Sequence, residues 1–108
     1  MARTVRWTET ATHDVEEAAD FIARDSRYYA AALVRDARAV ARSLRTLAER
    51  GRVVPEARSS NVREIPVKSY RLIYEVSPDR VSVLAFVHGS RDLPALWQRR
   101  EGTADPEA

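Results

Sequence analysis

The stretch VREIPVKSYRLIYEVSPDRVSVLAFV, residues 62–87, decides the fold. Apolar side chains recur there at every second position, which is typical of β-strands. A turn around Val67-Lys68-Ser69 and another at Ser77-Pro78-Asp79-Arg80 interrupt this alternation. Pro66 indicates a strand edge or a bulge. We expect an antiparallel meander of three strands, the last of them interior because it is apolar on both faces: 62–67, 69–76 and 81–87.

Upstream of this stretch the apolar period changes to that of helices. Thr8 and Ser26 are N-cap candidates, since a side-chain hydroxyl there accepts a hydrogen bond from a backbone N–H. Gly51 is expected to end the second helix in the left-handed conformation. Two apolar stripes at helical spacing follow the caps: Ala11, Val15, Ala18, Ala19 and Ile22, then Tyr29, Ala30, Leu33, Val34, Ala37, Val40, Ala41, Leu44 and Leu47.

These elements define the fold that we expect. A short strand at 3–7 precedes the helical hairpin, and residues 51–61 form a loop after it. The predicted class is α+β in the order β-α-α-β-β-β, an antiparallel sheet with the N-terminal helical hairpin packed on one face. Residues 1–100 make up the expected single domain, ending in a short helix or extended segment at 94–100, and 101–108 are a frayed tail.

Charge is unevenly distributed along the 108 residues. Lys and Arg number 18 against 16 for Asp and Glu, so the net charge is only +2. Acidic residues gather at 9–25, within the first predicted helix, and arginines dominate 63–100. A basic half suggests an anionic partner, either nucleic acid or an acidic peptide. A solvated arginine-rich surface would give the same pattern.

Several classes of chemistry are excluded by composition. The chain has no cysteine, which rules out disulfides, thiolate metal sites and thiol nucleophiles. Its first residues lack an apolar signal core, and no segment approaches the roughly 20 apolar residues of a membrane span. We therefore expect a cytoplasmic protein. The sequence contains no P-loop, zinc cluster or Ser-His-Asp arrangement, so neither a metal nor a cofactor is expected.

The order and spacing of several segments resemble RelE/ParE-type toxins. Val5-Arg6-Trp7-Thr8, with Asp14 behind it, resembles the opening of these proteins, and Gly51–Glu56 resembles the segment after their second helix. The strongest likeness lies in Val62–Tyr74 and in Val81–Leu93, which ends in His-Gly-Ser-Arg-Asp-Leu. The resemblance covers about residues 3–97 and is nearer to ParE-like than to RelE-like members.

The resemblance implies the toxin of a type II toxin–antitoxin module. Such a toxin is neutralised by an antitoxin whose acidic, disordered C-terminal segment folds on it. ParE-like members inhibit DNA gyrase and have no known hydrolytic site, whereas RelE-like members cut mRNA on the ribosome without metal. We favour the gyrase inhibitor. A RelE-like mRNA endonuclease and an inactive paralogue that only binds antitoxin are the alternatives, so whether the chain is an enzyme stays open.

Three residues could serve a RelE-like reaction. Metal-free RNA cleavage needs a base, an acid and cations that stabilise the phosphorane. Arg71 and Arg91 match the two arginines that RelE-like nucleases place on their active face. His88 titrates near neutrality and could move a proton. It could equally cap the end of its strand by hydrogen bonding to backbone or to Asp92, and we favour that structural role.

Two positions depart from the RelE-like pattern. Ile65 stands where such a nuclease carries a lysine, and Trp97 stands where it carries a tyrosine. Neither side chain can transfer a proton, although Lys68 could replace the missing cation. Trp97 could stack on a base or cover the edge of the sheet. These departures, together with the His-Gly-Ser-Arg-Asp-Leu ending, are our reasons for favouring the gyrase inhibitor.

A basic surface is expected on the sheet face that the helices leave open. Strand alternation places Arg71 and Ile73 on one face, and Tyr70, Leu72 and Tyr74 on the other. An acidic amphipathic helix or an added strand could bind between the cations, against apolar Ile65 and Ile73. The predicted antitoxin-binding or target-binding residues are Arg63, Lys68, Arg71, Arg91 and Trp97.

Overall fold

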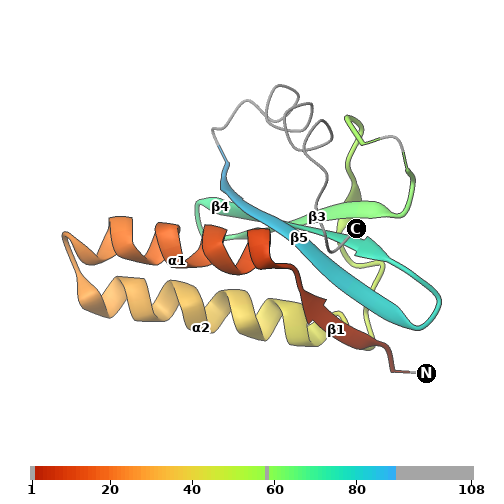
Figure 1. Ribbon diagram of the computed structural model, residues 1–108, viewed down its shortest axis with the longest axis horizontal. Coiled ribbons are helices and arrows are strands. Elements are labelled where there is room, and N and C mark those ends of the chain that lie inside the picture. The colour runs from red at the N-terminus through yellow and green to blue at the C-terminus, as the bar shows by residue number, and fades with distance from the viewer. Residues whose placement is uncertain (1, 58, 90–108) are drawn as a thin grey trace.

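The computed structural model describes residues 2–57 and 59–89. The two helices run side by side as a hairpin, and α1 also packs along β5 (Figure 1). The predicted segments at 94–100 and 101–108 lie outside the described residues. The elements are β1 (Thr4–Trp7), α1 (Glu9–Ala23), α2 (Arg27–Ser43), β2 (Arg52–Val53), β3 (Val62–Val67), β4 (Tyr70–Val76) and β5 (Arg80–His88).

The strands form one sheet in the order β1-β5-β4-β3-β2. The meander of β3, β4 and β5 is antiparallel, as the short connections between the three segments predict, and β5 is interior with a partner on each side. β1 pairs with β5 in parallel, so the sheet is mixed rather than wholly antiparallel. The α+β class and the helical hairpin are confirmed. Alternation determines which side chains share a face and carries no information on the direction of a neighbouring strand.

The segment 51–61, expected to be a loop, contains the extra strand β2. Arg52 pairs with Glu64 and Val53 with Arg63, so β2 is an edge strand of two residues. Pro66 lies two residues past Glu64 on β3, where the short strand β2 has already ended and does not pair with β3. A proline there removes no ladder hydrogen bond, which agrees with its predicted edge position.

The second helix ends earlier than predicted, and Gly51 does not close it. α2 stops at Ser43, where the backbone N–H of Leu44 donates to carbonyls of its last turn. Gly51 has no positive φ. It is required because a Cβ atom there would lie 2.6 Å from the Tyr74 hydroxyl and 2.6 Å from the Glu64 carbonyl. The prediction of a glycine cap was wrong, and the close approach of two strands explains the residue.

Both predicted N-caps are confirmed. The Thr8 hydroxyl accepts a hydrogen bond from the Ala11 N–H, and the Ser26 hydroxyl accepts one from the Tyr29 N–H. Thr8 is buried, and its hydroxyl also donates to the Val83 carbonyl at 2.9 Å. This residue therefore joins the start of α1 to β5.

Buried apolar clusters lie on both faces of the sheet. The larger one fills the space between the helices and the sheet and includes Leu33, Leu44, Leu72, Tyr74 and Phe86. The smaller one lies on the other face and consists of Val54, Val62, Ile73, Ala85 and Val87. Within the described ranges, no helix combines the length and apolar character that crossing a bilayer demands.

Candidate functional site

A buried carboxylate surrounded by arginines lies on the face of the sheet that the helices leave open. Glu64 of β3 is only 3% exposed. Its two oxygens accept hydrogen bonds from the Arg52 Nε at 2.9 Å and from an Arg71 Nη at 3.0 Å. A buried carboxylate without partners would be strongly destabilising, so the two ion pairs are what allows Glu64 to lie here.

The strand register explains why these three side chains meet. Glu64 lies directly opposite Arg52 on β2 and Ile73 on β4. Arg71 lies opposite Pro66, two residues farther along β3, and so shares the face of Glu64 as its diagonal neighbour. Each arginine comes from a different strand, and the carboxylate links them.

The three side chains border a recess of about 390 Å³. Arg50, Arg52 and Arg71 line it together with a single carboxylate, so its charged lining is net positive. The Arg71 Nε is buried and has no hydrogen-bond partner among the described residues. Guanidinium groups arranged in this way can bind a carboxylate or a phosphate through paired hydrogen bonds. The recess is lined by Arg50, Gly51, Arg52, Glu64, Ile65, Pro66 and Arg71.

Tyr74 holds the segment that carries Arg50 and Arg52 against the sheet. Its hydroxyl accepts a hydrogen bond from the Gly51 N–H at 2.9 Å and donates to the Ala48 carbonyl at 2.8 Å. Burial raises the pKa of this phenol, and the Gly51 hydrogen bond opposes part of that shift. The contact with Gly51 explains how a short edge strand without a packed side chain keeps its place.

Two of the predicted basic residues lie on the helix side instead. Arg63 is opposite Tyr74, and its guanidinium donates to the carbonyls of Gly51 at 2.7 Å and Glu49 at 3.3 Å. Lys68 forms an ion pair with Asp36 of α2 at 3.2 Å. The expectation that both cations surround the open face together with Arg71 was wrong, because the parity of β3 turns Arg63 toward the helices.

Ile65 also differs in position from the prediction. It belongs to the large cluster between the helices and the sheet, whereas Ile73 lies in the cluster of the open face. The alternation of β3 separates them: Ile65 shares the helix side with Arg63 and Val67. Of the predicted apolar pair, only Ile73 therefore packs on the open face, although Ile65 contributes to the lining of the recess.

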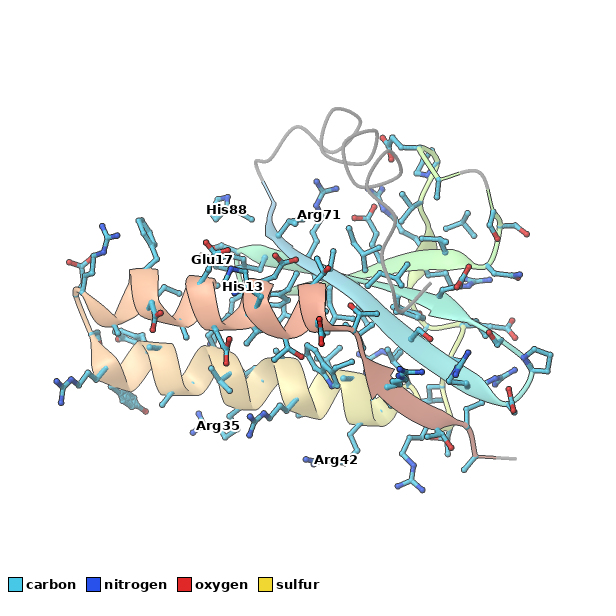
Figure 2. The ribbon with its side chains drawn as sticks, in the orientation of Figure 1. His13, Glu17, Arg35, Arg42, Arg71 and His88 are labelled. Atoms are coloured by element: carbon cyan, nitrogen blue, oxygen red, sulfur yellow. The ribbon has the colours of Figure 1, made fainter. Side chains whose placement is uncertain are left out.

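His88 and Arg71 are not brought together. His88 pairs with Tyr70 across the strands, and the two rings meet edge to face at 5.2 Å. Tyr70 in turn stacks on Phe86 at 5.1 Å, on the helix side of the sheet. Arg71 pairs with Val87 and faces the other way. In Figure 2 the His88 ring and the Arg71 side chain do not point toward one another.

Arg91 and Trp97, the remaining predicted site residues, lie outside the described residues. Sequence reasoning missed Glu64 and Arg52. A signal for Glu64 was present, since a carboxylate inside a strand with apolar neighbours must be paired if it is buried. No comparable signal existed for Arg52, which comes close to Glu64 only because β2 forms. No group of acidic or histidine side chains in the described part of the chain could hold a metal ion.

Two solved structures share this fold. One is from the chromosomal ParDE toxin–antitoxin system of P. aeruginosa, with a TM-score of 0.66 and 18% identity over 81% of this chain and 96% of that chain. The other is from the RelBE2 toxin–antitoxin complex of Mycobacterium tuberculosis, with a TM-score of 0.55 and 24% identity over 82% of this chain and 99% of that chain. No curated protein sequence matches the chain.

The fold thus defines the class: a small α+β protein with the fold of these two structures. The sequence narrows this class further. Residues 5–93 match the model of the ParE toxin of type II toxin–antitoxin systems, parDE. The chain belongs to the ParE toxin family.

Proposed function

We propose that the protein is a cytoplasmic toxin that inhibits DNA gyrase by binding and is neutralised by a cognate antitoxin. The observation that carries this proposal is the engagement of Arg71 by buried Glu64. An Nη group of the arginine is committed to an ion pair, and His88 lies on the other side of the sheet. The described residues therefore offer a rigid cationic surface and no adjacent acid and base.

The recess is suited to anionic protein groups. Arg52 has its side chain 73% exposed, so its remaining donors are accessible to a partner. Arg71 is 20% exposed and retains the unpaired Nε. We propose that acidic side chains of the antitoxin cover this recess, which would block the approach of the target. The predicted contributions of Arg91 and Trp97 to the same surface remain part of this proposal.

An experiment with two arms tests the proposal. Purified toxin is incubated with gyrase and relaxed plasmid, and separately with translating ribosomes and a message. We expect loss of supercoiling and an intact message. Message cut on the ribosome, abolished by Arg71→Ala or His88→Ala, would establish the endonuclease instead. Absence of both effects would leave the inactive paralogue.

The matched variants are Arg52→Gln, in the recess, and Arg80→Gln, an exposed arginine at the start of β5. Arg52→Gln keeps an amide N–H that can donate to Glu64, and Arg71 still neutralises the carboxylate, so we expect the variant to fold with a lower free energy of unfolding. If the recess binds the target, Arg52→Gln should weaken inhibition by about tenfold, as the loss of one charged contact does. Arg80→Gln should leave inhibition unchanged. Equal inhibition by both variants would exclude the recess as the binding surface.

A further inference from the structure

The two helices of the hairpin carry opposite charges. α1 contains acidic side chains along its length and neither arginine nor lysine. α2 contains several arginines and a single acid, Asp36, which forms an ion pair with Lys68. The field of such a molecule repels a polyanion from the α1 side and attracts it to the α2 side.

Four arginines form a row along the outer side of α2 and the turn that follows it. Arg35, Arg38 and Arg42 belong to the helix, and Arg45 comes just after its last residue, Ser43. At 3.6 residues per turn, the first three fall within an arc of roughly 60° around the helix axis. Figure 2 shows Arg35 and Arg42 on the side of α2 that faces away from α1.

The charges of this arginine row are accessible. All four side chains are exposed, and none of them forms an ion pair within the described ranges. Three of them also line a cavity of about 520 Å³ between α2 and β1, the arginine cavity, together with Arg3. No acidic side chain lines this cavity. The row therefore presents positive charge that nothing nearby in the described chain neutralises.

We propose that the arginine row binds duplex DNA through its phosphates, without sequence preference. At 1.5 Å per residue the row extends over about 15 Å from Arg35 to Arg45. A duplex carries one phosphate for roughly every 1.7 Å of its axis, so each guanidinium can meet a phosphate oxygen through charged hydrogen bonds. Contacts of this kind hold the duplex but carry no sequence information.

The composition of the row favours a phosphate backbone. No large apolar side chain is exposed between residues 30 and 46, so the row lacks the apolar centre of a protein interface. It also contains no aromatic side chain on which the bases of a single strand could stack. Exposed Ala31 and Ala39 lie beside the arginines, and their short side chains let the helix come close to the backbone of a duplex.

The test measures the affinity of the full chain for a labelled duplex of about 16 base pairs by fluorescence anisotropy at several salt concentrations. Each phosphate contact contributes about −0.9 to the slope of log K against log salt concentration. We expect a slope of about −3.6 or steeper, since other cations of the chain can add to the four. Two duplexes of unrelated sequence should bind equally, and a single strand of the same length should bind more weakly.

Single substitutions locate the site. Arg42→Gln should reduce the steepness of the slope by about 0.9 and weaken binding about eightfold at 0.1 M salt, equally for both sequences. Glutamine has nearly the helix propensity of arginine, so the variant should fold, and Arg35→Gln provides a second, independent copy of the measurement. The matched control is Arg52→Gln, at the opposite edge of the sheet from β1, which should leave the slope and the affinity unchanged.

Three results would overturn the proposal. The parent chain could fail to bind the duplex at low salt, or Arg42→Gln and Arg35→Gln could keep the parent slope. A single strand or a polyglutamate peptide could bind more tightly than the duplex and depend on Arg42, which would assign the row to another polyanion. The assay contains no gyrase and the proposal does not depend on gyrase inhibition, so the two proposals fail separately.

Discussion

Glu64 is the residue on which the cationic recess depends. It is a buried carboxylate that two arginines from two other strands neutralise. A buried ion pair adds little net stability as a whole, but the removal of one partner leaves the other charge uncompensated. Loss of the carboxylate should affect Arg71 more than Arg52, because the Arg71 side chain is mostly buried whereas the Arg52 side chain lies mostly in water.

Substitution of Glu64 should therefore destabilise the fold. Glu64→Ala is expected to lower the free energy of unfolding by about 3 kcal/mol, since it strands the Arg71 guanidinium in a partly buried site. Glu56→Ala, an exposed carboxylate on the loop after β2, should change it by less than about 0.5 kcal/mol. Urea denaturation measures both. Equal effects of the two substitutions would show that Glu64 is not held as described.

Tyr74 gives the fold a dependence on alkaline pH. Burial raises the pKa of its phenol above the usual value of about 10. The folded protein then keeps this proton at pH values where the unfolded chain has lost it. Folding takes up a proton in that range, so stability falls as pH rises above about 10 and until the folded pKa is passed.

Tyr74→Phe should remove this pH dependence. Compared with the parent chain, the variant is expected to lose less unfolding free energy between about pH 9.5 and 11, by up to about 1.4 kcal/mol per pH unit. At neutral pH it should be less stable, because the Gly51 N–H and the Ala48 carbonyl lose their partner. Tyr29→Phe, at an exposed position, should retain the parent slope. Parallel pH profiles for Tyr74→Phe and the parent would contradict the assignment.

At the scale of elements, the start of α1 is fixed more firmly than the start of α2. Thr8 caps its helix and also bonds to β5 in a buried position, whereas Ser26 only caps. Thr8→Val keeps the side-chain shape and removes both hydrogen bonds, so we expect a loss of about 2 kcal/mol. Ser26→Ala should lose about 1 kcal/mol. Thermal denaturation of the two variants side by side tests the ranking, and a reversed order would be inconsistent with it.

The helices and the meander could be predicted because their periods are properties of the local sequence. Apolar spacing and hydroxyl caps located α1 and α2, and strict alternation located β3, β4 and β5. β2 could not be found, since two residues carry no period and pair only because Gly51 lets the chain approach Tyr74. The parallel direction of β1 depends on the path of the hairpin and not on the residues of β1.

The site was predicted only in part, because the sequence of one strand shows which side chains share a face but not how neighbouring strands pair. Arg71 was placed on the correct face, because the parity of β4 follows from its own sequence. Arg63 was assigned to the wrong face because parity was not applied to β3, where Arg63 and Ile65 alternate with Glu64. The pairing of Arg52 with Glu64 joins two strands whose register no single-strand pattern contains.

At the scale of the whole molecule, cationic surfaces occupy the two opposite edges of the sheet. The Glu64–Arg71 recess lies at the β2 and β3 edge, and the arginine cavity lies at β1. Neither combines an acid and a base within the described residues. This arrangement is what the proposed inhibition by binding requires, and the His88 ring lies edge to face against Tyr70.

Induction of the toxin in growing cells tests this account most directly, with plasmid topology and the integrity of translated messages followed in the same culture. Inhibition by binding predicts that plasmids lose negative supercoiling while messages stay intact. It also predicts that His88→Ala, if folded, retains toxicity. Messages cleaved on the ribosome while plasmids remain supercoiled, with loss of cleavage in His88→Ala, would contradict it.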